Sequence, residues 1–225
     1  MDLKQFNELG YYIEKDVFSA EECERLIAES KTLENYKKGI FVPQMMPHRA
    51  NDIYLEALRK PEIVSTVTKI VGGKPVGLQT EFFYCRPGTS GFGKHQDNFF
   101  VEAPANVFAS AWCALTDVDT ENGCLIAWPG THKEGLLPVQ KVAAASNTWQ
   151  DPNARNEECI IPQQYKPVNI EVPKGAVCYI HSHLVHASNP NISKDRWRQV
   201  LLCTYIREGE SFRAGQYAQR EAIAV

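Results

Sequence analysis

Apolar and aromatic positions in the second half of the chain gather in short runs separated by Gly, Pro and Asn. From Lys74 onward the runs are rich in Val, Ile, Phe, Tyr and Trp, and they cover residues 76–86, 107–118, 124–128, 168–172, 176–181 and 197–206. Short runs between tight turns, with no helices alternating between them, are typical of an antiparallel β-sandwich or barrel. Asn122-Gly123 stands between two of the runs and predicts a hairpin there.

Two helices are predicted in the first third of the chain. The first covers residues 19–30, where Ser19 is the expected N-cap and Glu22, three positions later, completes a capping box. The second covers residues 61–71, because Pro61 suits a first helical turn and the two glycines that follow Val71 suit a helix end. Both helices are expected to support a sheet.

The chain has 225 residues, a length that fits one domain of the larger all-β kind or two small ones. We expect a single domain over residues 1–225, with helical support in 1–73 and a β-barrel core in 74–206. Residues 139–167 are long for a connection and poorly patterned. They form either a lid over a site or a loose insertion.

Charge and composition exclude several classes of function. The formal net charge of −3 offers no long-range attraction to phosphate backbones or anionic lipid, so we expect no nucleic-acid partner. There is neither an apolar stretch of about 18 residues for a membrane helix nor a signal-peptide pattern at the start. The seven cysteines are an odd number without a C-x-x-C pair, which predicts reduced, buried thiols in a cytoplasmic protein.

His95 and Asp97 form an H-x-D pattern after a glycine-rich connection. In an extended segment, residues two apart project from the same face, so the two side chains would stand side by side. With one further histidine they would complete the two-histidine, one-carboxylate facial triad, which leaves three coordination positions open on a divalent metal of intermediate softness. An H-x-D pattern by itself is weak evidence, because a surface histidine near a solvated aspartate is the commoner case.

Three histidines and an arginine near the C-terminus supply the second half of this pattern. His181, His183 and His186 lie within six positions, and Arg198 starts the next predicted strand. A hairpin across 181–205 would bring a histidine and an arginine together, and the planar guanidinium fork suits a carboxylate. For His181 and His183 we favour ordinary strand positions. For His186 and Arg198 we favour function over the alternative in which the arginine pairs with an internal glutamate.

Four motifs in order resemble the phytanoyl-CoA dioxygenase-like family of iron(II)/2-oxoglutarate oxygenases over most of the chain. They are GYYIEKDVFSAEECERL, FFYCRPGTSGFGKHQDNFF, AWCALTDVDTENGCLIAWPGTHKEG, and HASNPN followed by RWR. The resemblance implies a mainly β fold with flanking α-helices, a double-stranded β-helix of the jelly-roll or cupin-like kind. It also implies Fe(II) as cofactor, 2-oxoglutarate as cosubstrate, and a small-molecule substrate and dioxygen as partners.

Carried over residue by residue, the resemblance implies roles for seven side chains. The iron ligands, and so the catalytic centre, are His95, Asp97 and His186; the 2-oxoglutarate contacts are Arg198, Ser188, Trp112 and Tyr84. Arg198 follows His186 by one residue more than is usual in the family, which leaves Arg196 as a rival. Directly after the H-x-D pattern come the candidate substrate contacts Asn98, Phe99 and Phe100, whose aromatic pair fits a core equally well.

The expected activity is hydroxylation of an unactivated C–H bond of a small polar metabolite or natural-product intermediate, with release of succinate and carbon dioxide. Relatives that halogenate carry Ala or Gly in place of the carboxylate ligand, whereas Asp97 is present here. Two other classes stay open. They are a non-catalytic barrel-fold binding protein and a cupin-type metalloenzyme that does not use 2-oxoglutarate.

Overall fold

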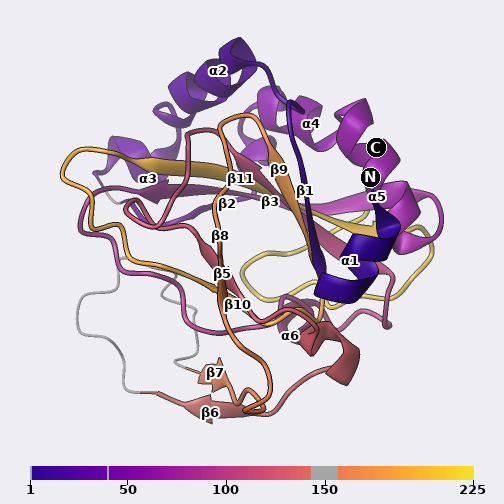
Figure 1. Cartoon of the computed structure of the whole chain (residues 1–225). Helices are drawn as coiled ribbons and strands as arrows, with labels where there is room; N and C mark the ends of the chain where they lie inside the picture. The colour runs from indigo at the N-terminus through magenta and orange to yellow at the C-terminus, as the bar shows by residue number, and fades with distance from the viewer. Residues whose placement is uncertain (1, 40, 143–156) are drawn as a thin grey trace.

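Two antiparallel sheets face each other, and helices cover the outer side of the larger one (Figure 1). The structure is a computed structural model that describes residues 2–39, 41–142 and 157–225. Every strand pairing in the described residues is antiparallel. The predicted class, mainly β with flanking α-helices, agrees with this arrangement.

The larger sheet has seven strands. In spatial order they are β1 (Tyr11–Glu14), β9 (Val177–His181), β4 (Phe108–Ala114), β11 (Arg198–Arg207), β3 (Pro75–Cys85) and β12 (Ile223–Ala224), with β2 (Gln44–Met45) also paired to β3. The smaller sheet is ordered β10 (His186–Ser188), β5 (Leu125–Ala127) and β8 (Val168–Ile170). A separate ribbon pairs β6 (Val139–Lys141) with β7 (Glu157–Cys159).

The helices gather mainly before β3. They are α1 (Leu3–Leu9), α2 (Ala20–Ser30), α3 (Glu34–Lys37), α4 (Asp52–Leu58), α5 (Pro61–Val71) and α6 (Asn98–Val101), with 3-10 turns η1 (Pro47–Arg49) and η2 (Thr131–Glu134). The two helices predicted from capping signals are confirmed. Ser19 and Glu22 form the reciprocal capping box of α2, and Gly72 ends α5 in the left-handed conformation.

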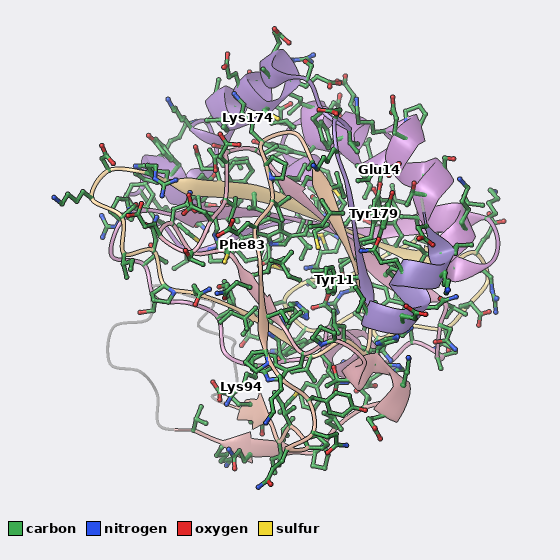
Figure 2. All side chains as sticks on the ribbon, in the orientation of Figure 1. Tyr11, Glu14, Phe83, Lys94, Lys174 and Tyr179 are labelled. Carbon is green, nitrogen blue, oxygen red and sulfur yellow. The ribbon has the colours of Figure 1, made fainter. Side chains whose placement is uncertain are left out.

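Alternate residues of the central strands serve two different cores. On the outer face, Phe82 and Tyr205 pack with Ile63 of α5 in a cluster beneath the helices. On the inner face, Phe83 and Trp112 belong to a cluster that also contains Leu125, Ile170 and other residues of the smaller sheet. In Figure 2, Tyr179 lies toward the helical side and Phe83 lies lower, toward the smaller sheet. The inner face is therefore the one that a site between the sheets would use.

The predicted hairpin at Asn122-Gly123 is wrong. The runs before and after it become β4 and β5, which belong to different sheets and do not pair. Gly123 does adopt a positive φ of 100°, and the Asn122 side chain closes the turn by donating to the main-chain carbonyl of Asp117 at 2.8 Å. The local turn chemistry was predicted correctly, but the turn carries the chain from one sheet to the other.

The predicted hairpin across 181–205 is wrong for the same reason. β10 pairs with β5 in the smaller sheet, whereas β11 pairs with β3 and β4 in the larger one. His186 and Arg198 consequently reach a common space from facing sheets instead of from neighbouring strands.

Only the ends of the suspected lid over residues 139–167 are described. Residues 143–156 lie outside the described part of the chain, so the choice between a lid and a loose insertion stays a prediction. The flanking strands β6 and β7 are anchored. The main-chain amide of Cys159 donates to the carbonyl of Lys94 at 2.9 Å, and the Lys94 ammonium pairs with Glu158 at 2.9 Å (Figure 2).

All seven cysteines are free and buried, in agreement with the prediction of packed thiols. Among the described residues, no helix combines the length and the apolar character that crossing a membrane requires.

Candidate metal centre

A two-residue main-chain bridge places His95 directly opposite His186. The amide of each donates to the carbonyl of the other at 3.0 Å. Residues that exchange both hydrogen bonds in an antiparallel pair carry their side chains on the same face. The bridge therefore brings two imidazoles from distant parts of the chain side by side, with ring centroids 4.3 Å apart.

The H-x-D segment is extended only at its first residue. His95 lies in the bridge, but Asp97 has helical dihedral angles (φ −58°, ψ −35°) and precedes the short helix α6. The expectation of a fully extended segment is thus wrong, although its consequence holds. The Asp97 carboxylate turns back toward both rings.

Main-chain carbonyls orient both imidazoles. Nδ1 of His95 lies 2.8 Å from the carbonyl of Gly93, and Nδ1 of His186 lies 3.0 Å from that of Leu184. A carbonyl can only accept, so each Nδ1 carries a hydrogen and each neutral ring presents the lone pair of its Nε2. A hydrogen bond at Nδ1 is the usual support of a histidine that binds a metal through Nε2.

The two oxygens of Asp97 have different partners. Oδ1 lies 3.6 Å from Nε2 of His95 and 3.6 Å from Nε2 of His186. Oδ2 accepts a hydrogen bond from the hydroxyl of Ser110 on β4. Because Ser110 occupies one oxygen, the other is left to face the two nitrogens. The three ligand atoms lie within 4.8 Å of one another, and among the described residues this is the one such group of metal-binding side chains.

The electrostatics prepare the group for a cation. Burial opposes ionisation of Asp97, but the neighbouring His186 and His95 and the Ser110 hydroxyl hold the pKa of its carboxyl well below the usual range. Burial and the nearby His95 lower the pKa of His186 to about 4. Burial acts against protonation of His95, yet the hydrogen bond and charge of Asp97 raise its pKa. Two imidazoles and an ionised carboxylate match the donor set of a non-haem iron(II) centre.

The triad opens into a cavity of about 510 Å³ between the sheets. Of the predicted site residues, those in its wall are His95, Asp97, His186, Arg198, Ser188, Trp112, Phe99 and Phe100. A cavity of this size is in the range of small-molecule sites.

Arg198 presents a buried guanidinium to the cavity wall. The residue is 3 % exposed, its NH1 donates to the carbonyl of Gly123 at 3.0 Å, and its Nε has no partner among the described residues. Its charge lies 5.8 Å from the ring centre of Trp112, and NH2 contacts the sulfur of Cys85. No ion pair involves Arg198 in the part of the chain described. A buried guanidinium without an anionic partner is a favourable donor site for a carboxylate, which accepts its hydrogen bonds.

Arg196, the rival, is already engaged at the surface. Its NH1 and NH2 pair with Asp119 at 2.7 and 2.9 Å, and NH2 also pairs with Glu121 at 2.6 Å. The side chain is 38 % exposed and does not line the cavity. The structure therefore favours Arg198 over Arg196.

Tyr84 needs correction as a 2-oxoglutarate contact. It points to the outer face of β3, where its hydroxyl donates to the carbonyl of Ser30 at 2.8 Å beneath the helices. The reason is strand alternation: Phe83 and Glu81 face the cavity, so Tyr84 faces away. Ser188 does reach the cavity, and its hydroxyl accepts from the amide of Phe92 at 2.9 Å.

Asn98 also needs correction, because it does not line the cavity. Its amide donates to the carbonyl of Ala103 at 2.9 Å and lies 2.9 Å from Nε2 of His183. The side chain is buried and holds the turn that follows Asp97. Phe99 and Phe100 stay candidates for substrate contact.

Two supporting residues were missed from the sequence. Ser110 is the polar exception in the apolar strand FASAWCA, and that interruption was the available signal. Gln96 lies between the two predicted ligands and is buried. Its side chain donates to the carbonyls of Gly135 at 2.7 Å and His183 at 2.6 Å, and accepts from the amide of Leu137 at 2.8 Å. Gln96 thereby anchors the H-x-D segment.

His132, His181 and His183 form a separate buried cluster. The His181 ring lies 4.9 Å from that of His132 and 5.8 Å from that of His183. Its Nε2 donates to Asn106 at 3.0 Å, and its Nδ1 accepts from the amide of His183 at 3.1 Å, so the ring is neutral and satisfied on both sides. These contacts support a structural role for His181, which ends strand β9 as expected, whereas His183 lies in the turn after β9 and the strand position expected for it is wrong. Burial lowers the pKa of all three, that of His181 to about 3.

Comparison with known proteins gives one family. The family model described as Phytanoyl-CoA dioxygenase (PhyH) matches residues 6–200. The Phytanoyl-CoA dioxygenase of Arabidopsis thaliana is 32 % identical over 176 residues, which are 77 % of this chain and 59 % of that relative. The chain thus spans about three fifths of that relative's length.

Solved structures confirm the fold class. The epimerase SnoN from nogalamycin biosynthesis, in complex with Fe3+, alpha ketoglutarate and nogalamycin RO, superposes with a TM-score of 0.75 at 19 % identity, covering 99 % of this chain and 93 % of SnoN. The alpha-ketoglutarate-dependent carbocyclase SnoK superposes with a TM-score of 0.73 at 20 % identity, covering 96 % of this chain and 86 % of SnoK. At these identities the likeness is one of fold.

Ser110→Ala is expected to weaken divalent metal binding about 10- to 100-fold, because Asp97 loses the donor that holds Oδ2 away from the ion. Isothermal titration of the metal-free protein with Mn(II) measures this. Ser110→Thr keeps the hydroxyl and should retain most of the affinity. Equal affinity of the alanine variant and the original protein would show that Ser110 does not position the ligand.

The histidine cluster is expected to make the metal-free fold less stable in acid. The folded-state pKa of His181 is about 3, against about 6.5 in an unfolded chain, so the unfolded state binds more protons below pH 6.5. Stability is full above about pH 6.5 and falls as the pH decreases toward the folded value. In urea titrations with a chelator present, His181→Gln should reduce the slope between pH 6 and 4 by about 1.4 kcal/mol per pH unit. An unchanged slope would contradict this.

Proposed function

Because the chain belongs to the phytanoyl-CoA dioxygenase family of iron(II)/2-oxoglutarate oxygenases, we propose that it hydroxylates an unactivated C–H bond of a small-molecule metabolite or natural-product intermediate. Dioxygen and 2-oxoglutarate are the other reactants, and succinate and carbon dioxide leave as products. His95, Asp97 and His186 are the proposed iron ligands. The whole of residues 1–225 is proposed to act as one oxygenase domain.

One observation carries the proposal above all others. Three ligand atoms of the right kinds converge within 4.8 Å of one another in a cavity that is also lined by Arg198, a buried arginine without an anionic partner among the described residues. The triad alone would suit several metalloenzymes. The arginine adds a requirement for a carboxylate at a distance from the metal, which a dicarboxylate cosubstrate meets and a lone water or dioxygen ligand does not.

The chain's own residues bind and orient the reactants. Arg198 is proposed to hold the distal carboxylate of 2-oxoglutarate through two guanidinium nitrogens, and the Ser188 hydroxyl is proposed to contact the same group. Trp112 lines the cavity between this end and the triad, and the apolar side chains of Phe83, Leu125 and Leu202 limit water there. Excluding water strengthens each of these polar contacts.

Iron(II) held by the triad would supply the activation of dioxygen, with 2-oxoglutarate as the reductant that loses carbon dioxide. The protein contributes by positioning the three ligand side chains. Ser110 donates to Oδ2 of Asp97 and so would leave Oδ1 to the metal, the carbonyls of Gly93 and Leu184 fix the ring tautomers, and the three ligand residues line the cavity. Hydroxylation is proposed over halogenation because Asp97 occupies the position that a halide would need.

Two other classes of function make different predictions. A non-catalytic barrel does not require an ionised Asp97 between two imidazoles. A cupin-type metalloenzyme that does not bind 2-oxoglutarate does not require the buried Arg198. Both residues line the same cavity. The epimerase and carbocyclase activities named for the two solved structures belong to those proteins.

His186→Ala is expected to abolish iron- and 2-oxoglutarate-dependent release of succinate, because only one imidazole and one carboxylate remain at the metal. Succinate is measured with a panel of small polar metabolites as substrates, and circular dichroism checks the fold. His48→Ala, at a histidine outside the cavity, should keep the activity. Undiminished succinate release by His186→Ala would refute the ligand assignment.

Arg198→Ala is expected to raise the KM for 2-oxoglutarate by more than about tenfold, since removing one partner of a buried charged pair costs about 2–5 kcal/mol. Arg196→Ala should leave this KM within about twofold, because that side chain pairs with Asp119 and Glu121 at the surface. Steady-state rates over a range of 2-oxoglutarate concentrations distinguish the two. The reverse result would move the carboxylate site to Arg196.

A further inference from the structure

One side chain of the cavity wall has a hydroxyl that the protein itself does not use. Thr204 of β11 lines the cavity and is 4 % exposed, yet its hydroxyl has no hydrogen-bond partner among the described residues. Most buried polar side-chain atoms have a partner, because burying one without a partner is unfavourable. A valine has nearly the same shape and would avoid this penalty. The hydroxyl is therefore better explained by a ligand than by the fold.

The strand register places this hydroxyl beside the proposed metal centre. Thr204 pairs with Ser110 of β4, and the Ser110 hydroxyl donates to the carboxylate of Asp97. Residues directly opposite each other in an antiparallel pair share one face of the sheet, with their Cβ atoms about 4.5–5.5 Å apart. A molecule that hydrogen-bonds to Thr204 is thus held next to the residue that positions a proposed metal ligand.

The backbone is irregular at the same point. β11 pairs regularly with β3 as far as Thr204 and Gln79, and then the register shifts, so that Tyr205 pairs with Gly77 instead of Leu78. β-Bulges of this kind are over-represented beside active sites, where they re-aim a side chain. The register shift is an observation independent of the hydroxyl, and both mark the same position in the cavity wall.

The charged side chains of the same wall already have protein partners. Nε of Arg220 donates to Oε1 of Gln79 at 2.8 Å, and Nε2 of Gln79 donates to Oε2 of Glu81 at 3.1 Å. Arg213 pairs with Glu102 at 2.7 Å. Because charges of both signs line the wall and are engaged within the protein, the wall selects neither an anionic nor a cationic group. The group that it presents to a ligand beside the metal centre is the neutral hydroxyl of Thr204.

Apolar side chains continue the wall beyond Thr204. Ile206, two residues further along β11, belongs to a cluster with Val101 and Phe108, both of which line the cavity. Small-molecule sites typically combine mainly apolar walls with a few placed polar groups that fix the orientation of the ligand. A molecule with an apolar body and one neutral oxygen matches these surroundings.

We propose that Thr204 is a specificity-determining residue that hydrogen-bonds a neutral oxygen of the primary substrate, in a hydroxyl or a carbonyl group. The bond holds this oxygen beside the metal centre, while the apolar body of the substrate packs against side chains such as Phe108. This inference rests on the proposed function only in taking the cavity as the substrate site. It narrows the substrates to alcohols and carbonyl compounds with a compact apolar skeleton.

The first measurement is the thermal stability of the metal-free protein without any ligand. Thr204→Val removes a buried hydroxyl that has no partner and is expected to raise the Tm by about 2–4 °C. Thr131→Val is the matched control, because the buried Thr131 hydroxyl donates to the carbonyl of Trp128 at 2.8 Å and accepts from the amide of Val185 at 3.0 Å. Loss of these bonds should lower the Tm.

The second measurement compares benzyl alcohol, acetophenone and toluene, which share an aromatic body and differ in the oxygen group. The protein is loaded with Zn(II), which prevents turnover, and with 2-oxoglutarate, and each Kd is measured by ligand-observed NMR. Thr204→Val should weaken binding of the alcohol or the ketone about 3- to 10-fold, the loss of one neutral hydrogen bond, and leave toluene within about twofold. Thr204→Ser keeps the hydroxyl and should keep most of the affinity. The oxygen probe that loses more identifies the group as a hydroxyl or a carbonyl.

Three results would overturn the role of Thr204. A lower Tm for Thr204→Val would show that the hydroxyl stabilises the fold, unchanged affinity for both oxygen probes would show that it binds at most an ordered water, and an equal loss for toluene would show an effect of shape alone. If Thr204→Val does not fold, a crystal structure of the unmodified protein with benzyl alcohol decides, since the alcohol oxygen is expected within hydrogen-bond distance of Oγ1 of Thr204. Because neither measurement needs turnover, the role of Thr204 can fail while succinate release succeeds, and the reverse.

Discussion

The site depends on one pair of hydrogen bonds, between the main chains of His95 and His186. These two bonds join the connection after β3 to strand β10 and set two imidazoles on the same face. The positions of the other residues of the centre are set relative to this bridge. The helical turn after His95 returns the Asp97 carboxylate to the same point, Ser110 from the facing sheet selects which oxygen is presented, and Gln96 anchors the turn to neighbouring loops. A slip of one residue in the bridge would turn one ring to the opposite face.

The facing sheets give the cavity two chemically different ends. Toward the start of β11, the buried Arg198 lines the cavity and has no anionic partner in the described part of the chain. Toward the Gln79 end of β3, the Thr204 hydroxyl has no hydrogen-bond partner among the described residues. Ser110, which holds Asp97, lies at the same level of the strand register as Thr204 and Gln79, so the proposed metal ligands lie toward this end.

Much of the fold and of the site was predictable because it is encoded locally. Ser19 and Glu22 predicted the start of a helix, and they form its capping box. The apolar runs from 76–86 to 197–206 correspond to observed strands within a few residues. The failures are all long-range. Asn122-Gly123 specifies a turn but not which strands it joins, so the sheet change could not be predicted. Tyr84 was predicted to contact 2-oxoglutarate, but it is the neighbour of a cavity-facing residue and points to the other face of the sheet. Asn98 was predicted to contact the substrate because it follows Asp97 in sequence, but its side chain hydrogen-bonds to the main chain of Ala103. Ser110 and Glu81 were visible only as polar interruptions of apolar strands, whose partners come from elsewhere in the chain.

The most direct test is anomalous diffraction from crystals of the protein loaded with iron(II) under anaerobic conditions. A single anomalous peak is predicted within bonding distance of Nε2 of His95, Nε2 of His186 and Oδ1 of Asp97, with Oδ2 still held by Ser110. A peak at any other position, or an ion that leaves Asp97 unbound, would contradict the assignment of the centre.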